Sequence, residues 1–199
     1  MKFDRRRFLG GALAGSIALA SSPGKAMAPA VLPGALLADA RAALDRHARN
    51  IPLRDVAGIV DFARHSRESR FRIVDLGSGH VLASYLVAHG RGSDPSNSGW
   101  AQRFSNVPGS HASAAGAYLT ANTYHGKHGA SRRLLGLDPG NNLALSRAIV
   151  IHGAEYVSEG LVSSQGRIGR SQGCFAVEQR VIAEVLGRLG PGRLLFVSK

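Results

Sequence analysis

The order of apolar and polar positions predicts a chain that begins with one helix and continues mainly as β-strands. Between Ala35 and Arg49 apolar residues recur three and four positions apart, as on one face of an amphipathic helix, and Pro52 ends that pattern. From residue 56 onward the apolar runs are short and alternate with turn residues, which is typical of strands. Strands are expected over residues 59–62, 71–76, 80–89, 116–124, 131–137, 149–152 and 194–197.

Two further features complete the predicted fold. Val177 to Leu189 has the spacing of a second helix, which Gly190-Pro191-Gly192 stops. Residues 90–110 are rich in Gly, Ser, Asn and Pro and predict a long loop, and long loops in compact domains are usually functional. The fold class that follows is mainly β with helical additions.

The N-terminus has the pattern of an export signal. Residues 1–10 are basic and contain Arg5-Arg6-Arg7 followed by Phe8-Leu9, a twin-arginine pattern. The apolar stretch up to Ala20 is too short to span a bilayer comfortably, and Ala26-Met27-Ala28 offers a small-x-small cleavage site. We therefore expect export to the periplasm, removal of residues 1–28, and no stable membrane insertion afterwards. An N-terminal amphipathic helix or membrane anchor is the alternative interpretation.

The remaining chain is expected to be a lead-in with the N-terminal helix, residues 29–54, followed by one domain, residues 55–199. The formal net charge of +12 falls to about +8 without residues 1–28. No interleaving of basic and aromatic residues and no nucleic-acid-binding motif accompanies this charge, so we expect no nucleic acid partner. We expect a monomer.

The candidate chemistry lies between residues 149 and 177. His152 ends an apolar run, and the single cysteine, Cys174, follows Gly173 after a loop rich in Gly, Ser and Arg. A thiol is only partly ionised near neutral pH, so a nearby imidazole is the usual way to generate a thiolate. One cysteine cannot form a disulfide within a monomer, which favours a working thiol in an exported protein. A small buried cysteine and a structural histidine are the alternative interpretation.

The motifs around these residues resemble a known family. His152, eighteen further residues and Ser171-Gln172-Gly173-Cys174 are similar to the His…Ser-His-Gly-Cys signature of L,D-transpeptidase (YkuD) catalytic domains. From about Ile59 to the C-terminus the chain more closely resembles the murein L,D-transpeptidase branch, YkuD_2. The motifs that carry this resemblance are Val87-Ala88-His89-Gly90, Phe104 to Ser110, Tyr124-His125-Gly126-Lys127-His128-Gly129, Arg147 to Ala154 and Gly166 to Cys174. The resemblance implies a YkuD-like β-sandwich, with residues 55–199 as its catalytic domain.

The resemblance also implies a mechanism. Cys174 would attack a carbonyl at an L-centre of a peptidoglycan stem peptide, with His152 as the base and no cofactor. A backbone carbonyl near Gly153 would orient the imidazole, and the N–H groups of Gly173 and Cys174 would hold the oxyanion. The side-chain amine of meso-diaminopimelate on a second stem would then resolve the thioester.

Two departures from the wider family leave the donor open. Gln172 stands where that family has histidine, and the Asn or Arg usual soon after the cysteine is absent. The donor is then either meso-diaminopimelate, giving 3–3 links, or L-Ala, giving 1–3 links. An L,D-carboxypeptidase or amidase with water as acceptor, and a non-enzymatic cell-wall-binding protein, are the alternatives. The second alternative predicts a buried or unreactive Cys174.

Other residues are candidates for the substrate groove. The resemblance places Tyr124 and His128 there, although both could instead hydrogen-bond the loop backbone. Arg167 and Arg170 are spaced to hold a substrate carboxylate, to lower the pKa of the thiol, or to pin the loop through backbone carbonyls. Because the pair His125-x-x-His128 lacks a third ligand and a His-Glu-x-x-His pattern, no metal site is predicted. The groove candidates are Tyr124, His128, Arg167, Arg170, Ser171, Gln172 and Gly173, with His89 and His111 as alternative bases.

Overall fold

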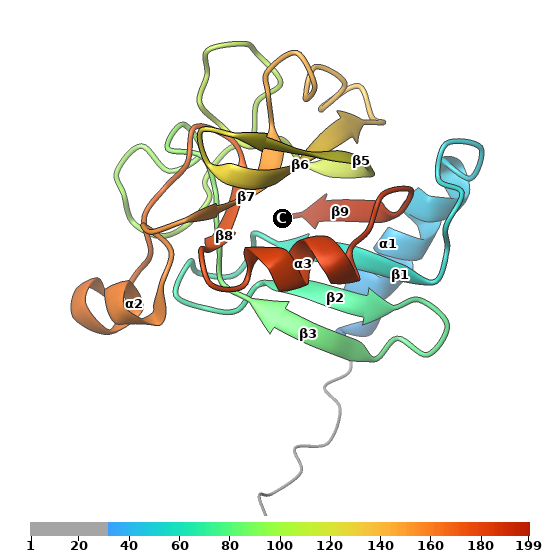
Figure 1. The fold of residues 1–199 in the computed structure, drawn as a ribbon, viewed down its shortest axis with the longest axis horizontal. Helices are drawn as coiled ribbons and strands as arrows, with labels where there is room; N and C mark the ends of the chain where they lie inside the picture. The colour runs from blue at the N-terminus through green and yellow to red at the C-terminus, as the bar shows by residue number, and fades with distance from the viewer. Residues whose placement is uncertain (1–31) are drawn as a thin grey trace, which may run out of the picture.

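The computed structural model describes residues 32–199, so the expected export signal lies outside the described residues. The described chain has three helices and nine strands, which confirms the mainly β class with helical additions (Figure 1). No described helix is long and apolar enough to cross a membrane. In chain order the elements are α1 (Gly34–Arg46), β1 (Val56–Asp61), β2 (Phe71–Asp75), β3 (Val81–Tyr85), β4 (Val87–Ala88), β5 (Gly116–Gly126), β6 (Gly129–Gly136), β7 (Val150–Ala154), α2 (Glu159–Gln165), β8 (Phe175–Glu178), α3 (Ile182–Arg188) and β9 (Leu194–Ser198).

All nine strands belong to one sheet that folds into two layers. The strand order is β3-β2-β1-β9-β5-β6-β7-β8-β4. Neighbours are antiparallel except β1 with β9 and β7 with β8, which are parallel. In Figure 1, β1, β2 and β3 form the lower layer, β5 and β6 the upper one, and β9 lies between them and pairs with both β1 and β5. The sheet thereby covers its own apolar face, as in a β-sandwich.

The main core fills the space between the layers. It is formed by inward side chains from both layers and from α3, with Phe62, Tyr118 and Phe175 among its largest members. Burying one such aromatic side chain removes roughly 150–250 Å² from water, which contributes about 4–6 kcal/mol before entropy is counted. On the other face of β1 and β9, α1 packs through Ala40, Ala43 and Leu44. The predicted amphipathic helix therefore packs on the domain, although it ends at Arg46 and not at Arg49.

The predicted strand over residues 80–89 is wrong in one respect, because the segment forms two strands. Its first part, β3, pairs with β2, and its last part, β4, pairs with β8, with Leu86 between them. β3 and β4 are the two edges of the sheet. Leu86 alone therefore connects the two edge strands, so the sheet nearly closes on itself. His89 follows directly after the second of them, β4.

The predicted helix from Val177 to Leu189 is also wrong at its start. Val177 belongs to β8, where it pairs with Gly153 of β7 and Val87 of β4, and α3 begins only at Ile182. Phe175 and Val177 alternate inward as strand residues. Their apolar spacing extends the pattern of the helix that follows, so periodicity alone could not separate the two elements.

The short helix α2 was not predicted, and its place follows from the parallel pair β7–β8. Parallel neighbours need a long crossover connection, usually helical, and α2 lies within that connection. The Ser158 hydroxyl accepts the Leu161 N–H at 3.2 Å at its start, and Gly166, at φ 71°, ends it. No residue of α2 is buried, so the segment has no apolar stripe that a sequence pattern could show.

Candidate active site

The register of the parallel pair β7–β8 brings Cys174 and His152 together. Ile151 pairs with Phe175 and His152 with Ala176, so Cys174, one residue before β8, lies beside Val150. Successive side chains of a strand point to opposite faces. Ile151 and Phe175 face the main core. Cys174 and His152 therefore share the opposite face, although twenty-one residues separate them in the sequence.

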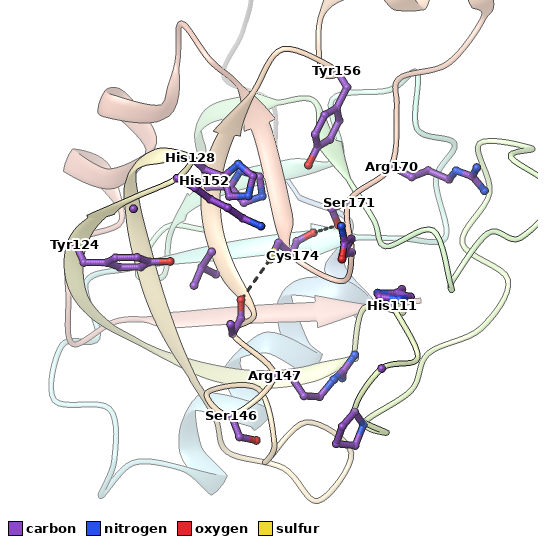
Figure 2. Close-up of a pocket in the computed structure, with 17 residues that line it drawn as sticks. His111, Tyr124, His128, Ser146, Arg147, His152, Tyr156, Arg170, Ser171 and Cys174 are labelled. Atoms are coloured by element: carbon purple, nitrogen blue, oxygen red, sulfur yellow. Dashed lines mark hydrogen bonds between the residues drawn. The ribbon is translucent and has the colours of Figure 1, made fainter.

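That face opens into a pocket of about 640 Å³ (Figure 2). Its walls come from the loop before β5, the β5–β6 hairpin, the segment that leads into β7, and the loop that leads into β8. Figure 2 shows Cys174 in the middle of these walls, with His128 and His152 on one side and Arg147 on another. The lining residues are Pro108, Gly109, His111, Tyr124, Gly126, Lys127, His128, Ser146, Arg147, Ala148, Val150, His152, Tyr156, Arg170, Ser171, Gln172 and Cys174.

The imidazole of His152 is held in one tautomer. Its Nδ1 lies 2.8 Å from the Gly153 carbonyl oxygen, and a carbonyl only accepts, so Nδ1 carries the proton and Nε2 is free to accept one. The contact with Gly153 that the sequence comparison implied is therefore present. His128 stacks on the ring of His152 with centroids 4.2 Å apart. Burial lowers the pKa of His152, and the hydrogen bond to Gly153 opposes that shift. The nearby His128 and Lys127 lower the pKa further, so the ring is neutral at neutral pH.

The Cys174 thiol is half-buried and donates a hydrogen bond to the Ala148 carbonyl at 3.5 Å. Burial raises the pKa of the thiol above its ordinary value, while the Val150 N–H, Lys127 and Arg147 oppose that rise. Within residues 32–199 no hydrogen bond joins Cys174 to His152. The resting site therefore holds a neutral thiol beside a neutral base, and not a thiolate–imidazolium pair.

Hydrogen bonds fix the backbone on both sides of the thiol. The Ser171 hydroxyl accepts the Gly173 N–H at 3.1 Å and donates to the Cys174 carbonyl at 2.7 Å. The Gly173 carbonyl accepts from the Ser113 hydroxyl at 3.0 Å. The expectation that the Gly173 N–H holds an oxyanion is therefore wrong for this conformation, because that N–H is bonded inside the loop. The Cys174 N–H stays next to the thiol and lowers the pKa of the thiol slightly.

The pocket is lined by basic side chains and by no carboxylate. Lys127, Arg147 and Arg170 line it, and no Asp or Glu does. The Arg147 guanidinium donates to the carbonyls of Ser105 at 2.6 Å and Ala112 at 2.5 Å, which ties the loop before β5 to the segment before β7. Such a pocket attracts an anionic ligand.

The predicted groove residues are only partly brought together. Tyr124, His128, Arg170, Ser171 and Gln172 line the pocket, and the Tyr124 ring packs 4.3 Å from the Arg133 guanidinium. Arg170 donates to the backbone carbonyls of Asp94 and Pro95, which is the pinning role and not a free carboxylate anchor.

Two predicted groove residues and one alternative base lie elsewhere. Arg167 and Gly173 do not line the pocket, and Arg167 instead donates to the Gln165 carbonyl at 3.2 Å. Arg167 lies in the bend directly after α2, whereas Gly169 lies against Tyr156 and donates its N–H to the Tyr156 carbonyl at 2.7 Å. His89 is fully buried and is no alternative base at the pocket, whereas His111 does line it.

Among the lining residues that were not singled out from the sequence, four bear on the chemistry of the site: Lys127, Arg147, Ala148 and Tyr156. Three of them fall inside the motifs around Tyr124 and His152, but nothing in those patterns indicates which side chain faces a pocket. Ala148 has φ 52°, a left-handed value that is costly for a residue with a Cβ, and this turn aims its carbonyl at the thiol. Tyr156 points its hydroxyl into the pocket (Figure 2), and burial raises the pKa of that phenol to about 12.

A second, more open pocket of about 450 Å³ adjoins the first. The two share Lys127, His128 and Tyr156, so the hairpin tip and Tyr156 form the boundary between them. Unlike the first pocket, the second carries a carboxylate, Glu155, together with Gln179. Within residues 32–199 no group of three or more His, Cys, Asp or Glu side chains is arranged to hold a metal ion.

The chain belongs to the family of L,D-transpeptidase catalytic domains, YkuD_2, whose model matches residues 31–198. The chain matches no curated protein. It is similar in fold to L,D-transpeptidase 3 of Mycobacterium tuberculosis, at 11% identity over 73% of this chain and 61% of that one, with a TM-score of 0.46.

Two further solved structures are similar in the same way. An L,D-transpeptidase of Mycobacterium smegmatis is 14% identical over 73% of this chain and 59% of that one, with a TM-score of 0.43. An L,D-transpeptidase of Enterococcus faecium is 14% identical over 72% of this chain and 50% of that one, with a TM-score of 0.40. This chain thus spans 50 to 61% of the length of these three proteins, and the family assignment rests on the match of the family model.

Proposed function

We propose that this chain is a periplasmic L,D-transpeptidase that cross-links peptidoglycan stem peptides, with Cys174 as nucleophile and His152 as base. The observation that carries the proposal is the β7–β8 register, which puts the only thiol and a buried, oriented imidazole on one face of a basic pocket. A half-exposed thiol in such a pocket is not what a non-enzymatic cell-wall-binding protein requires.

The first half-reaction is acylation of the thiol. As the donor carbonyl reaches Sγ, the hydrogen bond from the thiol to the Ala148 carbonyl breaks and the thiol proton passes to Nε2 of His152. The S–C bond forms in the same step. The Gly153 carbonyl stabilises the imidazolium through Nδ1–H. When the tetrahedral intermediate collapses, the C–N bond breaks and His152 returns the proton to the leaving amine.

Two donors are available for the oxyanion. The Cys174 N–H is one of them. The neighbouring Gly173 N–H is not available, because it is already bonded to the Ser171 hydroxyl. The Tyr156 hydroxyl is the other, because it points into the pocket, keeps its proton at neutral pH and makes no hydrogen bond within the described part of the chain.

The basic pocket suits the donor stem. Peptidoglycan stem peptides carry free carboxylates, and Lys127, Arg147 and Arg170 give the pocket three cations without a carboxylate. This charge selects an anionic donor chain without fixing which L-centre reacts, so 3–3 and 1–3 links both fit the pocket.

The second pocket suits the acceptor. In deacylation an amine nitrogen attacks the thioester carbonyl and gives its proton to Nε2 of His152 as the C–N bond forms. The C–S bond then breaks, and Nε2 returns the proton to the sulfur to restore the thiol. Glu155 lies in the pocket on the other side of His128, where a carboxylate attracts an ammonium group. The meso-diaminopimelate side-chain amine of a second stem is the proposed acceptor.

The experiment that tests this function compares the mature protein with its Cys174→Ala variant on purified sacculi, with muropeptides read by mass spectrometry. We expect new dimers that require Cys174, and fragmentation will show whether the donor residue is meso-diaminopimelate or L-Ala. Trimmed monomers without dimers would identify an L,D-carboxypeptidase or amidase instead. Identical muropeptides from both proteins would contradict the enzyme assignment and favour the cell-wall-binding protein.

The proposed location in the periplasm rests on the twin-arginine pattern of residues 1–28. It is tested separately, by fractionating cells that express the full chain. We expect the shortened protein in the periplasmic fraction, and a variant with Arg5-Arg6 replaced by Lys-Lys should accumulate uncleaved in the cytoplasm.

A further inference from the structure

A buried network of ionisable side chains lies behind the nucleophile loop, residues 170–174, and takes no part in the proposed chemistry. Arg70 is fully buried, and its guanidinium donates to the Val87 carbonyl at 3.1 and 2.9 Å and to the Arg64 carbonyl at 2.8 Å. Its Nη2 also lies 2.7 Å from His89 Nδ1. A guanidinium only donates, so Nδ1 accepts and the proton of neutral His89 is on Nε2.

Asp94 completes the network. His89 Nε2 lies 3.4 Å from Asp94 Oδ2, and neither side chain is more than 1% exposed. Asp94 also accepts the N–H groups of Ser98 and Gly99, each at 2.8 Å, and so closes the loop that follows it. Burial and the charge of Arg70 lower the pKa of His89 to about 4, so a neutral ring bridges a cation and an anion. Buried networks with every member bonded are rigid.

The backbone of the network is bonded directly to the nucleophile loop. The His89 carbonyl accepts the Ser171 N–H at 2.9 Å, and the Arg91 N–H donates to the Ser171 carbonyl at 2.8 Å. Gly90 and Ser171 accordingly form a β-bridge. From the other side, Arg170 donates to the Asp94 carbonyl. The nucleophile loop is thus hydrogen-bonded to the backbone of both His89 and Asp94.

A serine adds a third attachment. The Ser113 hydroxyl is buried, accepts the Gly90 N–H at 3.0 Å and donates to the Gly173 carbonyl at 3.0 Å. Ser171, which the network holds, bonds through its hydroxyl to the Gly173 N–H and to the Cys174 carbonyl, one backbone group before and one after the Cα that carries the thiol. A shift of His89 or Asp94 is therefore transmitted to Cys174 through hydrogen bonds alone.

We propose that Arg70, His89 and Asp94 are positioning residues that fix the backbone of residues 170–174 and with it the direction of the Cys174 thiol. The part of the thiol in catalysis rests on the proposed function, whereas its positioning is a property of the folded protein. Misplacing a reacting atom by about 1 Å lowers rates up to about 100-fold, so a rigid support behind the loop has a measurable effect.

The test uses two substitutions of the same kind. Asp94→Asn removes the charge that faces His89 and one of the two oxygens that accept from the His89 Nε2–H and from the Ser98 and Gly99 N–H groups. Asp138→Asn is the control, because Asp138 also faces a histidine, His47, at 2.8 Å and accepts a backbone N–H, from Ala117 at 2.6 Å. Asp138 lines neither pocket. Both variants lose a buried or half-buried carboxylate, so both should lower the melting temperature.

The readout is alkylation of the only cysteine by iodoacetamide, followed by intact mass across a range of pH. We expect Asp94→Asn to lower the plateau rate constant by about threefold or more and to change the pH profile, with Asp138→Asn unchanged in both. In the sacculus assay the same variant should lose about tenfold in kcat with little change in KM. A wild-type alkylation profile in Asp94→Asn, despite a lower melting temperature, would overturn the proposal.

Should Asp94→Asn fail to fold, Arg170→Gln breaks the outer attachment of the loop, its bond to the Asp94 carbonyl, and keeps both side chains of the buried pair. Arg170→Gln should slow alkylation in the same direction, and an unchanged rate would count against positioning. Alkylation also separates this inference from the proposed function. Slower alkylation of the variants together with an absence of dimers from the wild type would leave positioning standing and reject the transpeptidase assignment.

Discussion

The two side chains that we propose to react, Cys174 and His152, are both kept neutral by burial. Their chemistry therefore depends on moving one proton from Sγ to Nε2 as the substrate arrives, and on groups that stabilise the charge that then appears. The tautomer of His152 is set by the Gly153 carbonyl. The oxyanion donors in the proposed reaction are the Cys174 N–H and the Tyr156 hydroxyl, since the Gly173 N–H is bonded to Ser171.

Tyr156→Phe tests the oxyanion donor. Removing only the hydroxyl should lower kcat for dimer formation by about 100-fold, because one oxyanion donor contributes about 3 kcal/mol to transition-state stabilisation. Alkylation of Cys174, which forms no oxyanion at a carbonyl, should keep its rate within about twofold. Equal losses in both reactions would instead assign Tyr156 to the packing of the pocket.

Gly173→Ala tests the backbone before the nucleophile. Gly173 has φ 117°, and a Cβ there would meet the Ala112 carbonyl oxygen at 3.0 Å. We expect a loss of about 1–3 kcal/mol in the free energy of unfolding and a large loss of Cys174 reactivity. Gly166→Ala, at φ 71° with open space around it, is the matched control and should cost about 1–2 kcal/mol without slowing alkylation. Urea denaturation and alkylation kinetics give both quantities.

Among the elements, the β5–β6 hairpin brings a charged side chain that lowers the pKa of both Cys174 and His152. Its two-residue tip, Lys127 and His128, borders both pockets, and His128 stacks on His152. Lys127 lowers the pKa of Cys174 and that of His152. The hairpin thus favours the thiolate while it keeps the base unprotonated.

Lys127→Gln should shift the alkylation profile of Cys174 to higher pH, because a positive charge that lowers the pKa of the thiol is lost. The shift should shrink in high salt, since the side chain is exposed. Lys199→Gln makes the same change at the C-terminus, where Lys199 contacts Gln102, and should leave the profile in place. A profile of Lys127→Gln that coincides with the wild type would show that the hairpin charge does not reach the thiol.

The molecule as a whole is a sheet that nearly closes, with Arg70, His89 and Asp94 buried close to the point where its edges meet. Burial, together with Arg70, holds the pKa of His89 at about 4, against about 6.5 in an unfolded chain. Below pH 6.5 the unfolded state therefore gains a proton that the folded state does not gain until about pH 4. The stability of the fold must fall over that interval as the pH is lowered.

Urea denaturation at pH 7 and pH 4.5 measures this effect. We expect the wild type to lose about 2–3 kcal/mol from this group between the two values. The variant His89→Asn keeps an acceptor near Arg70 but cannot titrate, so it should be less stable at pH 7 and lose less on acidification. His152 and His128, whose pKa values are also lowered, add to the loss in both proteins. Parallel losses in wild type and variant would contradict the assignment to His89.

Sequence patterns predicted elements well where one stretch carried one period. The first hairpin, the long strand that became β5, and the closing strand β9 are in place, because short apolar runs there are covered on both faces, by the main core and by the cluster around α1. The predictions were wrong where the position of an element depends on strand pairing between residues far apart in the sequence. The 80–89 segment divides to serve both sheet edges, and α2 exists because parallel strands need a connection.

The sequence by itself determined the chemistry available to this protein: a single thiol, a histidine at a strand end, and a family signature around them. The tertiary structure alone decided how those groups are arranged. It put Cys174 and His152 on one face through a parallel register, bonded the Gly173 N–H to Ser171, and brought Arg147 and Tyr156 to the pocket. The physical reason is that hydrogen bonds and contacts between residues far apart in the chain fix these positions, and no local period of side chains encodes such pairs.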